Sequence, residues 1–316
     1  MVQKPVPAGM ATAESPPSSE SPQKEPRVAS FAFLKGGTTK TTLSVNTARY
    51  LAERNGPGST LLIDFDPNGH ATQNYDYGYD SLFDSGTDLD KVLLGNEADV
   101  HPAELALETP FKFDIIPSSN EHESIKNGLA SAMGGSARLH TRVVEELVDD
   151  EYDYIIIDHP SSVGIMNNNC AFASRNLLFP MLPKAETIKG LQRTQDRLIT
   201  PLEERDIDIN VLAVVPNLLE KRIDQQTNDR ELLEAVNTGD HLKSLVPNFA
   251  RITEEEWEKI DRGEMTPPSP GIRARDAITN GMKQAGLPLL DYDPDNDQNE
   301  HFEELAEIIE YGGIQR

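Results

Sequence analysis

One short segment combines glycine, lysine and threonine at a spacing typical of phosphate binding. It reads LKGGTTKTT over residues 34–42 and leads into a helix-like stretch. Gly36 and Gly37 allow backbone N–H groups to turn inward, and a helix that follows would point its positive N-terminus at the anion. In such a loop Lys40 reaches the β- and γ-phosphates of a nucleotide, and the Thr41 hydroxyl binds Mg²⁺. The spacing therefore predicts a nucleotide-phosphate site.

Three carboxylates follow two later apolar runs. Asp64 and Asp66 end the run that starts at Leu61, and Asp158 ends the run that starts at Tyr154. Ligand sites of open parallel sheets lie at the carboxyl ends of the strands, where an aspartate can order the water shell of Mg²⁺. One such aspartate could simply cap a strand end in an acid-rich chain. Three in this order behind a phosphate loop favour a nucleotide site.

The elements that must position these residues follow an alternating pattern. Short runs that are apolar on both faces predict buried strands, and stretches with helical periodicity lie between them. Strands are expected at residues 28–34, 60–65, 113–116, 154–158, 176–182 and 211–215, and helices at 41–53, 89–94, 136–148, 165–173, 187–204, 229–236, 273–284 and 300–311. This alternation predicts an α/β fold with a mostly parallel twisted sheet flanked by helices.

Composition divides the chain into a tail and one domain. Residues 1–27 are rich in Pro, Ser and Glu without apolar periodicity, so we expect them to be disordered. Residues 28–316 are expected to form a single domain with irregular excursions at 76–110 and 248–272.

Composition also excludes several classes of protein. No apolar run approaches the roughly 18 residues of a membrane span. The N-terminal residues contain no apolar segment of the kind that a secretory signal peptide has. We therefore expect a cytoplasmic protein. Cys170 is the one cysteine, which excludes a disulfide framework, a CxxC site and an iron–sulfur cluster held by this chain alone. The net charge of −24 resembles that of proteins from salt-accumulating halophiles, especially haloarchaea; a mesophilic protein with a basic partner is the alternative.

The ordered motifs resemble the ParA/MinD family of deviant Walker A ATPases. That family reads KGGxGK[ST]T, then a DxDPQG-type segment, then an IIDxPP-type segment. The corresponding segments lie at residues 35–42, 64–69 and 155–160, and the likeness continues at 116–119, 214–217 and 292–295. The resemblance covers about residues 28–311. It implies a P-loop NTPase fold, ATP and Mg²⁺ as cofactors, and a homodimer in the ATP state.

The resemblance also implies roles for individual residues. Lys35 matches the signature lysine that reaches the partner's phosphates across the dimer, where a trans cation acts as an arginine finger does. Asp66 would position the attacking water, and Lys40 would complete the catalytic set. The implied metal residues are Thr41, Asp64 and Asp158. The implied nucleotide contacts are Lys35, Gly36, Gly37, Thr38, Thr39, Lys40, Thr41, Thr42, Asn169, Pro216 and Asn217.

The chain departs from the family pattern at four positions. Thr39 stands where the family usually has glycine, and threonine would cost ~1–2 kcal/mol if that backbone needs a positive φ. Asn68 replaces a glutamine, Ser161 replaces a proline, and Arg175 stands where the family often has aspartate. No departure removes a chemically necessary group. The turnover rate stays open, and the family implies slow, partner-stimulated hydrolysis.

The branch of the family must be argued from the rest of the chain. Branches that use cysteines in this fold do not fit a chain with Cys170 alone. A MinD-type membrane positioner would carry a basic amphipathic helix at its C-terminus. The polar side of 300–311 is acidic and would be repelled by anionic lipid, so we expect this helix to pack on the core and expect no membrane partner. This leaves a ParA/Soj-like ATPase of plasmid or chromosome partition.

Such an ATPase binds non-specific DNA as an ATP dimer and associates with the nucleoid, and a ParB-like or other DNA- or cargo-bound activator stimulates hydrolysis. The candidate DNA-binding residues are Lys189, Arg193, Arg197, Lys221, Arg222, Arg230, Arg273 and Arg275. These cations could instead be paired with neighbouring carboxylates. Two alternatives stay open: a nucleotide-dependent protein-interaction switch that binds no DNA, and a MinD-like positioning ATPase. A biosynthetic enzyme of the CobQ or dethiobiotin-synthetase type is disfavoured, because such enzymes have no use for Lys35.

Overall fold

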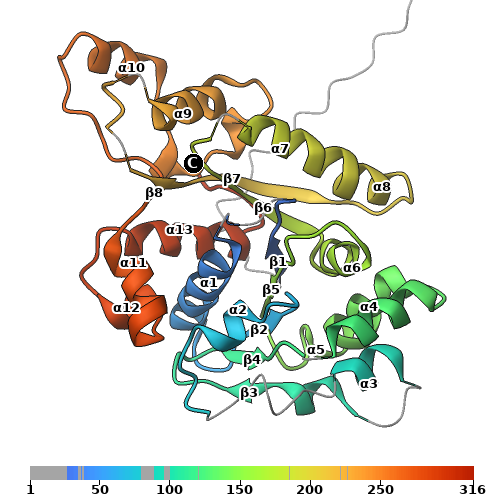
Figure 1. Ribbon diagram of the computed structural model, residues 1–316. Helices are drawn as coiled ribbons and strands as arrows, with labels where there is room; N and C mark the ends of the chain where they lie inside the picture. Colours follow the sequence, from blue (N-terminus) through green and yellow to red (C-terminus); the bar gives the residue numbers. More distant parts are fainter. Residues whose placement is uncertain are drawn as a thin grey trace, which may run out of the picture.

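An eight-stranded sheet forms the centre of the molecule (Figure 1). The computed structural model describes residues 27–34, 37, 39–79, 89–95, 100–119, 121–184, 186–220, 222–225 and 227–316. The strand order is β3-β4-β2-β5-β1-β6-β7-β8, and every neighbouring pair is parallel except β3 and β4. This confirms the predicted α/β fold. The predicted tail lies outside the described residues except for Arg27, which begins β1.

The strands are β1 (Arg27–Phe31), β2 (Thr60–Asp64), β3 (Leu107–Glu108), β4 (Asp114–Ile116), β5 (Tyr154–Asp158), β6 (Asn176–Met181), β7 (Asn210–Leu219) and β8 (Ile272–Arg273). All except β3 and β8 overlap the buried apolar runs of the sequence. Every residue of β2 and β5 is buried, because these central strands are covered on both faces. The two-residue strands β3 and β8 have no counterpart among the predicted strands.

Helices of varied length connect the strands. The α-helices are α1 (Lys40–Asn55), α2 (His70–Gln73), α3 (Leu89–Leu94), α4 (His122–Ser131), α5 (Glu145–Leu147), α6 (Ile165–Ser174), α7 (Thr187–Thr194), α8 (Thr200–Glu203), α9 (Asn228–Thr238), α10 (Glu254–Asp261), α11 (Asp276–Asn280), α12 (Leu289–Tyr292) and α13 (Asn299–Glu310). Three π-helical turns adjoin them, at His140–Val144, Gln195–Ile199 and Gly281–Ala285.

The two faces of the sheet carry different helices. Leu62 of β2 belongs to an apolar cluster with α1 and α13, whereas its neighbours Leu61 and Ile63 pack on the other face with α3, α4 and α6. Tyr50 of α1 stacks on Phe302 of α13 with ring centroids 6.5 Å apart. The C-terminal helix therefore packs on the core, as predicted.

A further apolar cluster lies where β6 and β7 meet helices α7 to α10, beside the group around α1 and α13 (Figure 1). Within it, α10 occupies part of the stretch at 248–272 that was expected to be irregular. Thr253 and Glu256 form a reciprocal capping box at its start, with the Thr253 hydroxyl accepting from the Glu256 N–H. That box was the sequence signal for α10.

Three predicted helices are broken into shorter pieces, among them 187–204, which divides into α7, a π turn and α8. The stretch at 136–148 contains a 3-10 turn (Gly135–Ala137), a π turn and α5, and the stretch at 273–284 contains the end of β8, α11 and a π turn. Periodicity alone predicts that a segment is helical, not where its hydrogen-bond pattern changes.

Candidate nucleotide-binding site

The phosphate loop connects β1 to α1. Gly37 and Thr39 both have a positive φ, of 71° and 61°. Lys35, Gly36 and Thr38 lie outside the described residues. Lys40 begins α1, so the predicted strand, glycine-containing loop and helix N-terminus follow one another in the expected order.

Thr39 stands where the family usually has glycine. Its backbone adopts the left-handed conformation that favours glycine, with φ 61° and ψ 26°. A residue with a Cβ is strained there, by roughly 1–2 kcal/mol. The Asn217 side-chain amide donates a hydrogen bond to the Thr39 hydroxyl, an interaction that glycine cannot accept. The same bond brings Asn217 and its neighbour Pro216, both on β7, to the phosphate loop.

Lys40 is buried, with 6% of its surface exposed. Its Nζ donates to the carbonyl of Phe33 at 3.5 Å. Burial lowers the pKa of Lys40, while the charges of Asp158 and Asp66 oppose that shift. An anion beside this buried ammonium would stabilise its charged form.

The carboxylates predicted to support a metal lie at the ends of two adjacent strands. Asp64 and Asp158 are register partners across β2 and β5. The Thr41 hydroxyl donates to Asp158 Oδ2 at 2.7 Å, and the Ser44 hydroxyl donates to Oδ1 at 3.4 Å. Burial, reinforced by the charge of Asp64, raises the pKa of Asp158 to about 8. Ionised Asp158 would therefore be stabilised by a cation.

Asp64 and Asp66 are held by the loop that follows β2. Asp64 Oδ2 accepts from the Thr72 N–H at 2.8 Å and from the Thr72 hydroxyl at 2.7 Å. Burial nonetheless raises the pKa of Asp64 to about 7. Asp66 Oδ1 accepts from the backbone N–H and the side-chain amide of Asn68, at 2.9 and 2.8 Å. Asn68 thus orients Asp66 although it replaces the family's glutamine.

The donor set fits Mg²⁺. Mg²⁺ in nucleotide sites keeps several waters and takes few protein ligands, with phosphate oxygens completing its shell. Thr41 supplies a hydroxyl, and Asp64 and Asp158 supply buried carboxylates whose ionisation is costly without a cation. Among the residues described, no group of three His, Cys, Asp or Glu side chains could hold a metal ion on its own.

A hollow of 240 Å³ opens beside the phosphate loop. Its lining includes Thr39, Thr42, Asn217, Ile278 and Met282. The Thr42 hydroxyl lies 3.6 Å from the Met282 sulfur. A mainly apolar wall with a few polar groups, next to a phosphate site, suits the flat base of a nucleotide.

Asn169 is placed differently from the other predicted nucleotide contacts. It is fully buried on α6, where its Oδ1 accepts from the Leu139 N–H at 3.0 Å. Its amide donates to the carbonyls of Gly135 and Ile165 at 2.8 and 2.9 Å. In this conformation Asn169 fixes the segment before α5 onto α6, so a nucleotide contact by Asn169 stays a prediction.

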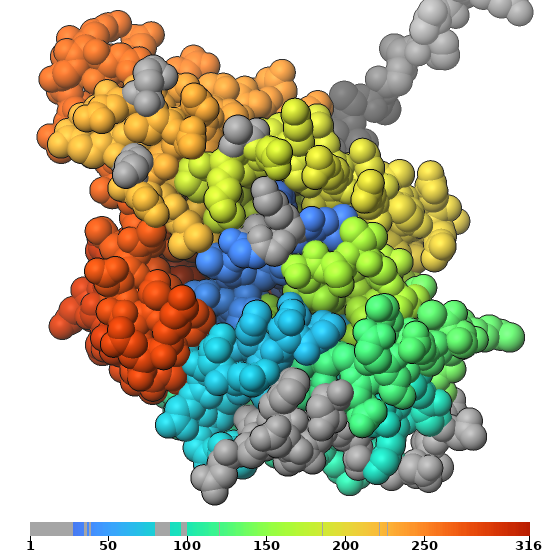
Figure 2. Space-filling model, in the orientation of Figure 1, coloured from blue at the N-terminus to red at the C-terminus, as the bar shows by residue number. Residues whose placement is uncertain are grey.

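Helix α7 and the turn that follows it carry three exposed members of the predicted DNA-binding set. Lys189, Arg193 and Arg197 are all exposed along α7 and the π turn that extends it. Figure 2 shows this yellow-green segment at the surface. The helix is tied to the phosphate loop, because the Leu34 N–H donates to the Thr194 hydroxyl at 3.3 Å.

The structure corrects the prediction for Arg230. Only 5% of this residue is exposed. Its guanidinium forms ion pairs of 2.7 Å with Glu234 and Asp261 and lies 4.8 Å from the Trp257 ring centre. Arg230 joins α9 to α10 because its long apolar stem packs among them, so it is not a surface cation.

The remaining predicted cations are dispersed. Arg222 is exposed and pairs with Asp224 at 2.7 Å. Arg275 pairs with Asp297, and both Arg273 and Arg275 line the hollow beside the phosphate loop rather than the surface of α7. Lys221 lies outside the described residues.

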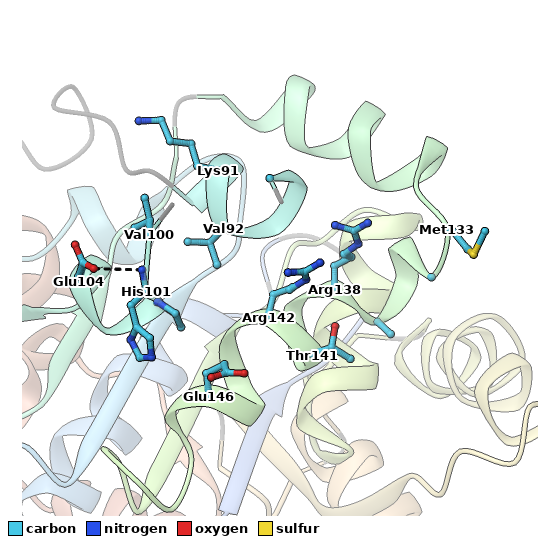
Figure 3. A pocket seen from close by; sticks show the side chains of 14 residues that line it. Lys91, Val92, Val100, His101, Glu104, Met133, Arg138, Thr141, Arg142 and Glu146 are labelled. Atoms are coloured by element: carbon cyan, nitrogen blue, oxygen red, sulfur yellow. Dashed lines mark hydrogen bonds between the residues drawn. The ribbon is translucent and has the colours of Figure 1, made fainter. Parts of the chain in front are cut away.

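A second hollow, of 890 Å³, lies between α3 and the segment after α4 (Figure 3). Arg138 and Arg142 rise from one helical segment at its wall, and Arg138 donates to the Leu93 carbonyl at 2.9 Å. Met133 projects from its rim with 96% of its surface exposed. None of the residues predicted for nucleotide or DNA lines this hollow.

Sequence reasoning missed the side chains that support the carboxylates. Thr72 and Ser118 are buried, and they connect the loop after β2 to the segment after β4. His122 follows on α4 and is also buried. The available signal was position, since both hydroxyl residues lie a few residues beyond a strand end, where ligand sites form.

A phosphate loop between strand and helix, with carboxylates at the ends of neighbouring parallel strands, defines a P-loop NTPase. A family model described as an AAA domain (AAA_31) matches residues 26–210. The chain belongs to that family, and its relatives place it among the ParA/MinD ATPases.

The curated relatives extend over most of the chain. An uncharacterized protein of Methanocaldococcus jannaschii is 27% identical over 284 residues, which cover 89% of this chain and 97% of that protein. The sporulation initiation inhibitor protein Soj of Bacillus subtilis is 26% identical over 239 residues, which cover 72% of this chain and 87% of Soj.

Solved structures share the fold. The complex of Cyanothece McdA with ATP has a TM-score of 0.68 at 21% identity and covers 93% of this chain and 98% of McdA. Cobyrinic acid a,c-diamide synthase from Mycobacterium smegmatis, with bound ATP analog and magnesium, has a TM-score of 0.60 at 24% identity and covers 83% and 98%. In the described part of this chain, no helix has the length and apolar character needed to cross a membrane.

Proposed function

We propose that the protein is a ParA-like ATPase that dimerises on Mg-ATP, binds non-specific DNA in that state and is reset by hydrolysis, in plasmid or chromosome segregation. The observation that carries the proposal is the 2.7 Å bond from Thr41 to Asp158 beside the buried Lys40. This arrangement leaves a cation and a carboxylate that Mg²⁺ and phosphate together would neutralise.

Each residue of the site has a task in this proposal. Lys40 binds the β- and γ-phosphates, and Asn217 holds the phosphate loop beside the hollow that receives the base. Asp66, fixed by Asn68, accepts a hydrogen bond from the attacking water and orients it. Lys35 of the partner protomer supplies the trans cation.

The metal residues are Thr41, Asp64 and Asp158. Bound Mg²⁺ would supply charge neutralisation at the phosphate oxygens. Thr41 would hold it directly, while the two carboxylates orient its water shell. The buried setting of both carboxylates strengthens their attraction for a cation, because little solvent screens them.

Helix α7 is the proposed DNA interface. Its three exposed cations can contact phosphates, and the bond from Leu34 to Thr194 ties the helix to the nucleotide loop. Gly190 supports the same link, because a Cβ there would lie 2.8 Å from the Phe33 ring. A conformational change in the phosphate loop on nucleotide binding would therefore move α7. In this way ATP would control DNA binding.

The testing experiment measures retention on a long non-specific DNA duplex with ATP and with ADP. We expect retention with ATP alone and its loss in Lys40→Ala, which lacks the phosphate-binding cation. Asp66→Ala should bind ATP, fail to hydrolyse it and stay on DNA. An Asp66→Ala protein that hydrolyses ATP normally would refute the role of Asp66.

The second candidate is a nucleotide-dependent protein-interaction switch, favoured by the dispersal of Arg222, Arg230 and Arg275 into local ion pairs. ATP-dependent dimerisation without DNA retention would support it. The biosynthetic alternative has a structural neighbour of the same fold, but fold alone does not fix function.

A further inference from the structure

A chain of buried hydrogen bonds lies behind Asp66. The Ser118 hydroxyl donates to the backbone carbonyl of Asp66 at 2.8 Å and lies 2.7 Å from His122 Nε2. The Ser118 N–H donates to the Thr72 hydroxyl at 2.8 Å, and that hydroxyl donates to Asp64. Ser118 therefore contacts the backbone of Asp66 and also Thr72, which supports the Asp64 carboxylate.

The donors and acceptors of this chain define the protonation of His122. A hydroxyl has one proton, and Ser118 gives it to the Asp66 carbonyl, which can only accept. His122 Nε2 must therefore carry a hydrogen and donate it to Ser118 Oγ. His122 Nδ1 is buried without a hydrogen-bond partner among the residues described, as the bare nitrogen of a neutral ring would be. Burial also lowers the pKa of His122.

The bond between His122 and Ser118 joins Ser118 to a helix that is packed in the core. His122 is the first residue of α4, whose Ile125 and Leu129 are buried in the core. The imidazole therefore anchors Ser118, and through it the Asp66 backbone, to a packed helix. Without His122, Ser118 would keep its bond to the Asp66 carbonyl but lose the contact that holds its hydroxyl on α4, while Asp66 would keep its local bonds with Asn68 and Asp64.

We propose that His122, acting through Ser118, is a positioning residue that holds Asp66 for water orientation during ATP hydrolysis. The inference rests on the proposed role of Asp66. It requires the neutral Nε2–H form of His122 and no direct contact between His122 and nucleotide. Removing a residue that orients a metal ligand typically costs roughly 10- to 100-fold in activity, and we expect an effect at the low end of that range for a residue that orients Asp66.

The test uses the full chain and separates hydrolysis from binding. We expect Ser118→Ala and His122→Leu to lower kcat for ATP about tenfold while the ATP Kd changes less than about twofold. His122→Gln should restore most of the rate, because its amide can donate where Nε2–H does. Ser174→Ala is the matched control: it removes a buried hydroxyl bonded to Ser30 at 2.9 Å and should hydrolyse ATP normally.

A second measurement needs no variant. Nitrogen NMR of the imidazoles should identify His122 as the Nε2–H tautomer in the wild-type protein. The Nδ1–H tautomer would overturn the inference, as would a wild-type rate in both Ser118→Ala and His122→Leu, or a His122→Gln protein as slow as His122→Leu.

Asp66→Asn separates this inference from the proposed function. If Asp66→Asn still hydrolyses ATP, the role of Asp66 fails and the inference falls with it. If Asp66→Asn is inactive while both His122→Leu and Ser118→Ala are fully active, only the inference fails. We expect His122→Leu to cause no further loss in the Asp66→Asn background, since both changes act on one step.

Discussion

At the scale of single residues, Thr39 combines an unfavourable backbone with a favourable side-chain bond. Its φ of 61° suits glycine, whereas its hydroxyl accepts from Asn217. Comparing Thr39→Ala with Thr39→Gly separates the backbone strain from the hydroxyl bond. Both variants lose the hydroxyl, and only glycine relieves the backbone strain. We expect Thr39→Gly to be more stable than Thr39→Ala by about 1 kcal/mol in urea unfolding of the nucleotide-free protein. Equal stabilities would mean that the loop relaxes around alanine.

The buried carboxylates predict how stability depends on pH. Burial raises the pKa values of Asp64 and Asp158 above the ordinary 3.8, to about 7 and about 8. Between about pH 4 and pH 8 the folded protein therefore binds more protons at these sites than the unfolded chain does, so their contribution to stability falls as pH rises.

The measurement is the free energy of unfolding at about pH 6 and about pH 8 without nucleotide. We expect the loss between these values to be smaller in Asp158→Asn than in the wild-type protein, because asparagine does not ionise. The comparison of variant with wild type cancels the general repulsion within an acidic chain. An identical loss in both proteins would contradict the raised pKa of Asp158.

At the scale of elements, Arg230 connects two helices that the sequence did not link. Its stem and guanidinium pack between Glu234 of α9 and Trp257 and Asp261 of α10. We expect Arg230→Leu to destabilise the fold by about 2 kcal/mol in urea unfolding, through lost packing and cation–π contact. Arg193→Leu, on the exposed face of α7, should stay within about 0.5 kcal/mol of wild type. If Arg230→Leu and Arg193→Leu changed the free energy of unfolding equally, Arg230 would be a surface residue like Arg193.

The strands and helices differ in how well the sequence predicts them. β2 and β5 were located well because both faces are buried, which leaves an unbroken apolar run. β8 was missed because two residues carry no period, and it forms only where Gly271 lets the chain approach Pro216 of β7. Arg230 was misjudged because a basic residue at helical spacing looks the same whether it faces solvent or an unforeseen helix.

For the candidate site, sequence could place residues at strand ends but not their partners. Asp64 and Asp158 were predicted because each ends a buried strand. The bond of Asp66 to Ser118 depends on the register of β2 and β4, because it joins the segments that follow these two strands. Contacts that join segments more than forty residues apart, such as Ser118 and Thr72, are set by that register and not by any local pattern.

At the scale of the whole molecule, the net charge of −24 opposes DNA binding, so contact must be concentrated on a small basic surface. We propose that this surface lies on helix α7 and the π turn after it, where Lys189, Arg193 and Arg197 are exposed. In the described part of the chain these three cations form no ion pair, whereas Arg222 is paired with Asp224. A dimer would present the basic surface twice, which raises its avidity for a long duplex over that of a monomer.

Salt dependence tests this surface quantitatively. With three phosphate contacts on each protomer and therefore six in a dimer, the logarithm of the DNA association constant should fall against the logarithm of KCl concentration with a slope of about −5. Arg193→Gln removes one contact from each protomer, so the slope should become less steep by about 2. Arg222→Gln removes an exposed cation that is already paired, and should leave the slope nearly unchanged. Binding is measured on a long non-specific duplex with ATP across a KCl series. If Arg222→Gln shifts the slope while Arg193→Gln does not, the DNA surface lies on the loop after β7 and not on α7.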